Sequence, residues 1–300
     1  MGADMDKIKQ VAIVGGVHGN EFSGIYLVKQ YQAAPEAAAR PSFNTELVWA
    51  NPEAHRANQR YLHSDLNRQF KHSDLANTEL SNYEQSRAKV LNAQLGPKGN
   101  AKTDLLIDLH NTTSNMGACL ILTQAGAFYN QLAAYVKMVM PEAVISRDED
   151  HIAANEHALM CTLGRYGVLV EVGPQSQSVL RQDILELMHT MTQHILDFVE
   201  LYNSNNLPVL PKHTEAFRYL HSIKLPMNEN GERIGMVHKN IQDNDYQPIN
   251  PGDAIFTLFD GKEIYYDGDI TVYPTFINEA AYYDNNLAMS LNEKVLITLD

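Results

Sequence analysis

The sequence predicts an α/β fold with a mixed or largely parallel sheet, followed by a smaller all-β region. Short apolar runs alternate with amphipathic segments through the first two-thirds of the 300 residues, which is typical of strands interleaved with helices. After "NSNNLP" (203–208), Pro, Gly, Asn and Tyr become frequent, and turn pairs separate short runs. We therefore expect two domains, an α/β domain over 1–207 and a β-rich domain over 208–300.

The first elements are read from apolar periodicity and from start and stop signals. "QVAIVGG" (10–16) predicts a buried strand, and a helix over 21–32 begins just after its glycines. "TELVWA" (45–50) predicts a second strand. A helix over 79–95 follows, and it ends at the Gly-Pro pair that comes next, which is a stop signal.

The remaining elements of the first domain follow the same logic. "DLLIDLH" (104–110) and "GACLILT" (117–123) predict strands, and a helix is expected over 126–138. "GVLVEVG" (167–173) is another apolar run of strand length. Residues 181–203 have apolar positions at helical spacing and predict the longest helix.

Charge and composition exclude several classes of partner. The chain has 36 acidic and 23 basic residues, a net charge of −13, so neither nucleic acid nor an anionic membrane is expected to bind it. No apolar run approaches the roughly 18 residues that span a bilayer. Only two cysteines occur, and the N-terminus lacks an apolar signal region, so we expect a cytoplasmic protein. An anionic small molecule stays possible, because a local arginine cluster dominates its own cleft.

The strand ends carry the residues that indicate chemistry. His18 and Glu21 follow the first strand three residues apart, a spacing that puts both on one side of a helical turn. His110 closes another apolar strand. Imidazole and carboxylate are zinc ligands, and three of them with one open position are typical of catalytic zinc. The alternative for His110 is a core histidine bonded to a backbone carbonyl.

A water activated by zinc needs a base, and Glu171 in "VLVEVGPQ" is the candidate. A carboxylate within an apolar strand is costly to bury unless it is paired or functional. A low-dielectric setting raises the pKa of such a carboxyl group toward the range useful for proton transfer. The alternative is a structural glutamate paired with Arg165 or Arg181.

A polar, irregular segment, "RYLHSDLNRQF" (60–70), holds a further cluster. Arg60 and Arg68 offer planar guanidinium groups that suit carboxylates and oxyanions, although both could be solvated surface arginines. Asp65 and Asp108 are candidate partners for the outer N–H of zinc-bound imidazoles. No GxSxG, Walker or GxGxxG motif is present, which removes the enzyme classes based on those motifs.

Five ordered motifs together resemble one known family. "GGVHGNEFSG", "SDLNRQF", "DLHNTTSNMG", "VEVGPQSQSVLRQDIL" and "VYPTFINEAAYY" look like the aspartoacylase family, which belongs with the zinc carboxypeptidase-like amidohydrolases. The resemblance covers about residues 10–285, almost the whole chain. It implies a zinc-carboxypeptidase-like mixed-sheet N-terminal domain and a β domain that narrows the entrance to the active site.

The resemblance also implies a ligand set and a base. One zinc ion per chain would be held by His18, Glu21 and His110, and Glu171 would act first as general base and then as acid. The reaction implied is zinc-dependent hydrolysis of a linear amide, the activity of an amidohydrolase or deacylase. The partner is then a small-molecule N-acyl amino acid, while the oligomeric state and the physiological divalent metal stay open.

Substrate contacts come from the resemblance alone. It assigns polarisation of the substrate carbonyl to Arg60 and binding of the substrate carboxylate to Asn67 and Arg68. It assigns a further contact to Tyr282 in "NEAAYY", supplied by the C-terminal domain. A non-catalytic zinc-binding protein on the same scaffold is the rival class. The joint presence of ligands, base and arginines argues against it.

One stretch departs from the family's pattern. In the pattern of aspartoacylases proper, a Tyr and an Arg lie about ten to fourteen residues before the base and bind the acidic substrate. Counting back from the base, this chain has Cys161 and His157 at those places, and Arg165 or Arg147 would have to replace the charge. N-acetyl-L-aspartate is the expected substrate. The alternatives are N-acyl aromatic or cysteine-conjugated amino acids, and succinylglutamate.

Overall fold

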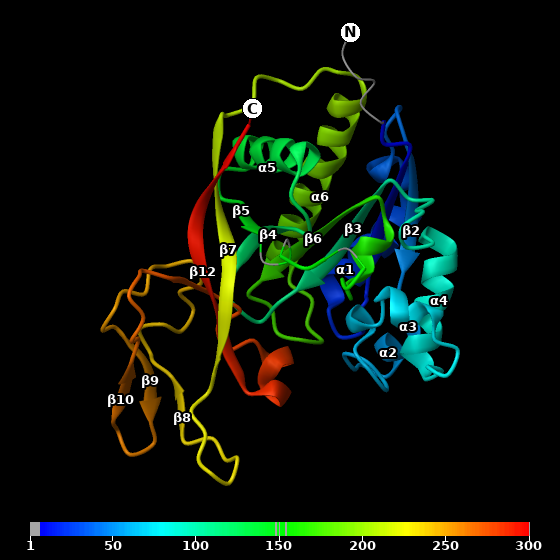
Figure 1. The fold of residues 1–300 in the computed structure, drawn as a ribbon. Helices are drawn as coiled ribbons and strands as arrows, with labels where there is room; N and C mark the ends of the chain where they lie inside the picture. The colour runs from blue at the N-terminus through cyan, green and yellow to red at the C-terminus, as the bar shows by residue number, and fades with distance from the viewer. Residues whose placement is uncertain (1–6, 148, 150, 154, 300) are drawn as a thin grey trace.

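The computed structural model describes residues 7–147, 149, 151–153 and 155–299 (Figure 1), so the N-terminal segment in which no signal is expected lies largely outside it. Within this range one large sheet has the order β11-β12-β7-β5-β4-β6-β3-β1-β2, and a small sheet has the order β10-β9-β8. The strands are β1 (Gln10–Gly15), β2 (Asn44–Trp49), β3 (Leu105–Asn111), β4 (Gly117–Leu122), β5 (Val144–Arg147), β6 (Tyr166–Gly173), β7 (His213–Lys224), β8 (Gly235–Val237), β9 (Ala254–Leu258), β10 (Glu263–Tyr265), β11 (Tyr273–Thr275) and β12 (Leu287–Thr298).

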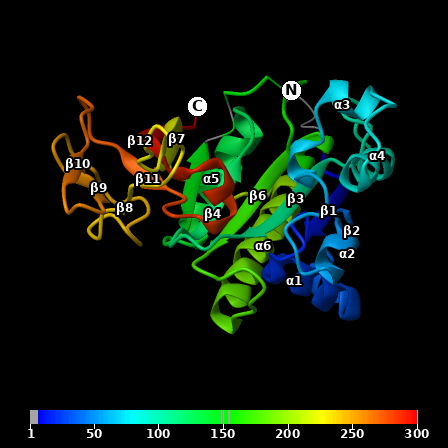
Figure 2. The same cartoon turned by 90° about the horizontal axis from the view of Figure 1, so that it is seen from below.

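Helices cover both faces of the large sheet. Figure 2 shows α1 and α6 on one side of the sheet and α3 and α4 on the other. The α-helices are α1 (Phe22–Ala33), α2 (Pro52–Arg56), α3 (His72–Ala76), α4 (Tyr83–Leu95), α5 (Ala127–Val139) and α6 (Gln182–Asn203); the 3-10 turns are η1 (Pro35–Ala38), η2 (Leu66–Arg68), η3 (Met160–Leu163) and η4 (Ala280–Asn285). None of the helices in the described ranges has the length and apolar composition to cross a bilayer.

Side-chain alternation along the strands decides on which face the polar residues lie. In β3, Leu105, Ile107 and Leu109 belong to the core shared with α1, α5 and α6. The alternate residues, Leu106, Asp108 and His110, point to the opposite face, where α4 and the η3 segment pack. The candidate site therefore lies on the α4 face of the sheet.

A close approach between β1 and α1 fixes the loop that carries His18. Gly16 has φ of +72°, a left-handed conformation that turns the chain out of the strand. A Cβ atom on Gly24 would lie 2.6 Å from the carbonyl oxygen of Leu109, so only glycine lets α1 pack this near to β3. The loop between Gly16 and α1 consequently lies over the carboxyl ends of β1 and β3, which pair in parallel.

The fold class predicted from the sequence is confirmed, with parallel and antiparallel pairs in one sheet and a β-rich C-terminal part. The predicted helix over 79–95 begins only at Tyr83, because Asn82 and Gln85 form a capping box. The short strand β5 was not predicted. It pairs in parallel with β7, so the large sheet continues into the region after 208, and the domain boundary stays a prediction.

The C-terminal part is tethered to the β3–β4 loop by a buried carboxyl group. Asp245 accepts hydrogen bonds from the backbone N–H groups of Asn115, at 3.1 Å, and Ile277, at 3.2 Å. Burial raises the pKa of Asp245 to about 7, although the hydrogen bonds from the N–H groups of Ile277 and Asn115 act in the opposite direction. The two halves of the molecule are thus joined through a group that titrates near neutral pH.

We expect this tether to make stability fall as the pH rises through about 7. The pKa of Asp245 is higher in the folded than in the unfolded protein, so its contribution is full below about pH 4 and lost above about pH 7. Between pH 6 and 8 the loss is about 1 kcal/mol. The measurement is the difference in Tm between wild type and Asp245→Asn, which should favour wild type more at pH 6 than at pH 8. Asp253→Asn, at an exposed carboxylate that accepts from Asn250 N, is the control. Equal pH profiles in both comparisons would contradict the tether's titration.

Candidate metal centre and active site

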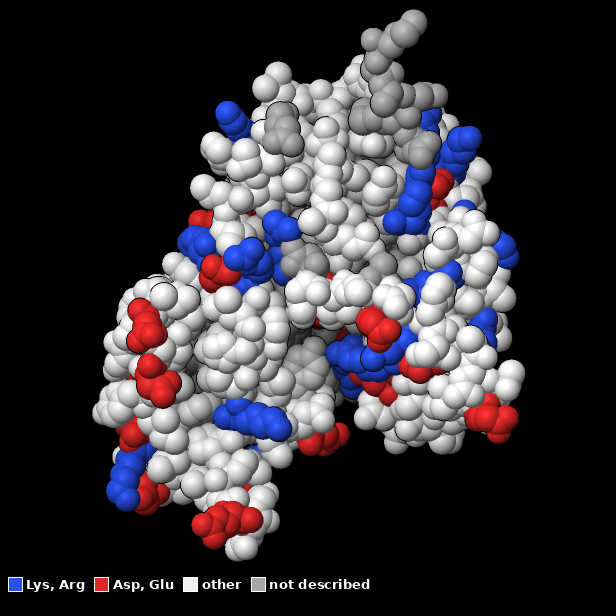
Figure 3. Space-filling model, in the orientation of Figure 1, with Lys and Arg blue, Asp and Glu red and all other residues white. Residues whose placement is uncertain are grey.

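A cleft on the α4 face of the sheet collects the predicted residues. Figure 3 shows the surface hollowed between the C-terminal part and the part around α2 and α3, with basic and acidic atoms side by side at the rim. Side chains from the β1–α1 loop, the η2 segment, β3, β6 and the η4 segment line the cleft. All eight residues predicted for the site are among them: His18, Glu21, Arg60, Asn67, Arg68, His110, Glu171 and Tyr282.

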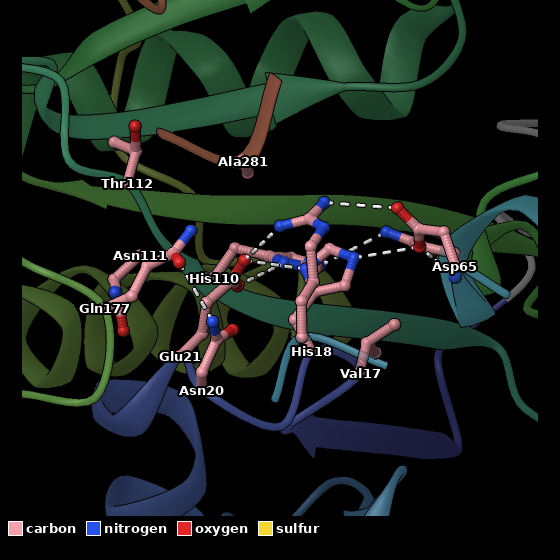
Figure 4. Close-up of polar contacts among 12 residues, drawn as sticks. Val17, His18, Asn20, Glu21, Asp65, His110, Asn111, Thr112, Gln177 and Ala281 are labelled. Carbon is pink, nitrogen blue, oxygen red and sulfur yellow. Dashed lines mark hydrogen bonds and ion pairs between the residues drawn. The ribbon is translucent and has the colours of Figure 1, made fainter. Parts of the chain in front are cut away.

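The three predicted metal ligands point toward one another (Figure 4). His18 Nδ1 lies 2.7 Å from Glu21 Oε1, and His110 Nδ1 lies 2.8 Å from Glu21 Oε2. One possible ligand atom from each of the three residues lies within 4.8 Å of the other two, and all three side chains are buried. The ring nitrogens of His110 lie beside the carboxylates of Glu21 and Asp108. His110 is therefore not the core histidine bonded to a backbone carbonyl that was the alternative.

The outer nitrogen of each imidazole faces a second carboxylate. His18 Nε2 lies 3.0 Å from Asp65 Oδ1, and His110 Nε2 lies 3.1 Å from Asp108 Oδ2. An imidazole that binds a metal through Nδ1 carries its proton on Nε2, and in each ring that nitrogen lies within 3.1 Å of a carboxylate oxygen. The donor set therefore fits a metal ion bound between the two Nδ1 atoms and Glu21.

The charges in this cluster also fit a divalent cation. Although burial acts in the other direction, His18 and His110 hold the pKa of Glu21 well below its usual range. Burial likewise opposes the charged form of His110, but Asp108 and Glu21 raise its pKa well above the ordinary value. Three carboxylates, those of Glu21, Asp65 and Asp108, contact the two imidazoles, and Arg60 pairs with the first two of them. Such a concentration of anionic groups around two imidazoles favours a divalent cation.

Glu171 lies on β6 directly beside His110. The two residues pair in the parallel register of β3 and β6, so both side chains leave the same face of the sheet. Burial raises the pKa of the Glu171 carboxyl group well above its usual range. The arginines considered as structural partners pair elsewhere: Arg165 with Asp104 at 3.0 Å, and Arg181 with Asp183.

The predicted arginines come from the segment that runs from the end of α2 to η2. Arg60 Nη1 donates to Glu21 Oε1 at 2.9 Å, and Nη2 donates to Asp65 Oδ2 at 3.2 Å. Arg68 donates from Nη1 to the backbone oxygen of Asn67 at 2.8 Å. The Asn67 side chain accepts from Met160 N at 2.7 Å, which leaves its amide N–H groups facing the cleft near His110. Arg60 is therefore fixed by two carboxylates before any ligand binds.

The C-terminal part contributes one wall through the η4 segment. Glu279 accepts hydrogen bonds from Thr112 Oγ1, Thr113 N and Thr113 Oγ1 with one carboxylate oxygen, and from Ala281 N with the other. This buried residue ties the turn that carries Tyr282 to the loop after β3. Enclosure in the cleft raises the pKa of Tyr282 above its usual value. No local pattern in the sequence indicates a role for Glu279, because its partner Thr113 lies 166 residues away.

The stretch that departs from the family's pattern is buried beneath the cleft. His157 and Cys161 are both 0% exposed, and neither lines the cleft; Leu159, between them, does. His157 Nε2 lies 3.0 Å from the backbone oxygen of Glu149. Arg165, proposed as a replacement charge, lies at the other end of β6 and belongs to a different cavity. Sequence reasoning missed Glu149, which lines the cleft after β5.

This arrangement is that of a hydrolase with a potential metal centre at the ends of its strands. Comparison with known families agrees: residues 7–199 match the catalytic domain described as succinylglutamate desuccinylase/aspartoacylase, and residues 212–294 match the barrel-sandwich hybrid domain of the same family. The chain belongs to the succinylglutamate desuccinylase/aspartoacylase family.

Individual relatives span nearly the full length of the chain. A probable aspartoacylase from Nostoc sp. is 42% identical over 293 residues, covering 98% of this chain and 99% of that protein. The human N-acyl-aromatic-L-amino acid amidohydrolase (carboxylate-forming) is 40% identical over 299 residues, covering 98% and 93%. The crystal structure of murine aminoacylase 3 has a TM-score of 0.92 and 38% identity, covering 98% and 99%.

Proposed function

We propose that the protein hydrolyses the amide bond of an N-acyl amino acid with one bound zinc ion. The observation that supports this function best is the His18–Glu21–His110 cluster with Glu171 on the adjacent strand. The relatives named as amidohydrolases and aspartoacylases support the same reaction class. Both cysteines, Cys119 and Cys161, are buried, and two isolated cysteines accord with a reducing compartment such as the cytoplasm.

In amide hydrolysis, the metal ligands and Glu171 would have different roles. Zinc held by the three ligands supplies Lewis-acid polarisation and lowers the pKa of water in the site. Glu171 takes a proton from the attacking water, whose oxygen adds to the carbonyl carbon of the amide. The same carboxyl group then gives that proton to the leaving nitrogen as the C–N bond breaks.

The other polar groups would bind and orient the substrate. Arg60, held by Glu21 and Asp65, is preorganised to stabilise the negative charge that develops on the carbonyl oxygen. Arg68 and the amide of Asn67 offer donors for the free carboxylate of the amino acid. Tyr282 adds a phenolic donor from the η4 segment, which supports a role for residues 208–300 in narrowing the entrance.

The remaining wall of the cleft bears on the choice of amino acid. Ile121, Leu159, Leu169 and Phe276 line it and belong to one apolar cluster. Glu149 lies at the same end, following the strand that pairs with β4, and burial raises its pKa. A neutral apolar side chain fits these walls better than a second carboxylate, whose charge would lose hydration there. Among the candidate substrates, this observation favours N-acyl aromatic amino acids over N-acetyl-L-aspartate.

A substrate panel tests that preference. With zinc-loaded protein, we expect kcat/KM for N-acetyl-L-tyrosine to exceed kcat/KM for N-acetyl-L-aspartate by about tenfold or more, since removing one methylene-sized apolar contact alone changes specificity by roughly 10-fold. Succinylglutamate, named in the family description, completes the panel. A preference for the aspartate substrate would restore the first expectation from the sequence. No turnover of any N-acyl amino acid would overturn the proposed function itself.

A further inference from the structure

The loop that joins Arg60 to Asp65 is anchored by a fully buried carboxylate outside the cleft. Glu84, in the first turn of α4, is 0% exposed. It accepts hydrogen bonds from three successive backbone N–H groups, those of Leu62 at 2.7 Å, His63 at 3.0 Å and Ser64 at 3.3 Å. Such a row of amides around one anion fixes the path of the backbone between the two functional side chains.

A fourth contact connects the same carboxylate to the loop that carries His18. The side chain of Asn51, also fully buried, donates from Nδ2 to Glu84 Oε1 and to the backbone oxygen of Val17, each at 3.4 Å. Val17 immediately precedes His18. Glu84 therefore lies where the supports of both loops meet, although it does not line the cleft.

We infer that Glu84 is a positioning residue for the metal centre, acting through Arg60 and Asp65, and this inference rests on the proposed function. Asp65 reaches the outer nitrogen of His18, and Arg60 reaches the carboxylate of Glu21. A shift of residues 62–64 would move both contacts together. Partners that orient metal ligands typically change metal affinity or activity by 10–100-fold when they are lost.

The chemistry of the anchor requires a carboxylate rather than an amide. Two carboxylate oxygens accept from four N–H groups. A glutamine has one acceptor oxygen, so its NH2 group would face backbone N–H donors on one side and leave them without an acceptor. Glu84→Gln thus removes the anchor with little change of volume, which makes it a suitable probe.

The experiment compares Glu84→Gln with Glu53→Gln. Glu53 is an acidic residue in the first turn of α2 that pairs with Arg56 on the surface, so it is a matched control. For the folded Glu84→Gln protein, measured well below its Tm, we expect about a tenfold loss in kcat and about a tenfold weaker zinc affinity by chelator competition. Glu53→Gln should match wild type in both measurements. Glu84→Asp, which keeps the charge on a shorter side chain, serves as the second variant if the first does not fold.

A double-mutant cycle separates positioning from general stability. If Glu84 acts through Arg60, the change Glu84→Gln should lower kcat far less in an Arg60→Ala background than in wild type. Wild-type kcat and zinc affinity in a folded Glu84 variant would overturn the inference, as would effects on kcat that simply multiply with those of Arg60→Ala. The zinc measurement stands without any substrate. If the wild-type protein binds zinc but hydrolyses no N-acyl amino acid, the proposed function is wrong. The zinc affinities of the Glu84 variants then still test the role of Glu84.

Discussion

Replacing Glu171 with glutamine is expected to lower kcat by about 10³-fold while the zinc content stays near one per chain. General acid–base catalysis by one side chain contributes roughly 10²–10⁴-fold, and Glu171 would serve at two steps of the reaction. The glutamine keeps the shape of the side chain but cannot accept or return a proton. Since Glu171 is not among the three clustered ligands, metal binding should be preserved. The measurements are steady-state kcat and metal analysis on the same preparation.

The control for this variant is Glu186→Gln on α6. Glu186 lies on the helix that packs on the other face of the sheet, and its side chain interacts with Gln182. It should retain wild-type kcat and zinc. Substantial turnover by the Glu171 variant would show that another group moves the proton. Loss of zinc together with turnover would mean that Glu171 belongs to the ligand set, and the roles assigned to the cluster would have to be redrawn.

The second large effect is expected from His110→Ala, which should abolish zinc binding and turnover together. This change removes one of the three proposed ligands, so the loss of zinc affinity should exceed the roughly 10–100-fold that follows loss of an outer partner. Asp108→Asn provides that comparison, because it leaves His110 in place and removes only the charge behind it.

Thermal unfolding with and without zinc gives a readout independent of substrate. A ligand that binds only the folded state at 100 times its Kd stabilises by about 2.7 kcal/mol, so zinc should raise the Tm of wild type clearly. The Tm of His110→Ala should not respond. His213→Ala, at an exposed histidine near Thr298, is the control and should respond as wild type does. An unchanged zinc response in the His110 variant would exclude this residue as a ligand.

The residues at strand ends could be predicted because local sequence determines their position. His110 closes a run of apolar residues that only Asp108 interrupts, and alternation along β3 and β6 puts it on the same face as Glu171. His18 follows β1, whose glycines mark the turn into α1. Parallel pairing of β1, β3 and β6 then gathers these ends at one edge, which is a property of the fold class rather than of any single residue.

Other features depend on tertiary contacts that leave no local pattern. Glu84 in a polar first helical turn is indistinguishable in sequence from an exposed glutamate, yet it is fully buried against a loop 20 residues earlier. Glu279 accepts hydrogen bonds from Thr113, which lies 166 residues earlier in the chain. The resemblance to the family predicts that substrate choice depends on the positions of His157 and Cys161. Both side chains are fully buried, and Leu159 between them lines the cleft instead.

The continuity of the large sheet through β5 and β7 has a consequence for how this architecture can be engineered and how it can diverge. β5 gives β7 a parallel edge, and β7 in turn carries β12 and β11. The C-terminal part therefore cannot be exchanged as an independent unit. A chimera of residues 1–207 of this chain with the C-terminal part of a relative would have to re-form the backbone pairing of β5 with β7 as well as the side-chain contacts. Because Phe276, Ala281 and Tyr282 of the C-terminal part line the cleft, variation around the η4 segment is a direct route to changing what the cleft admits.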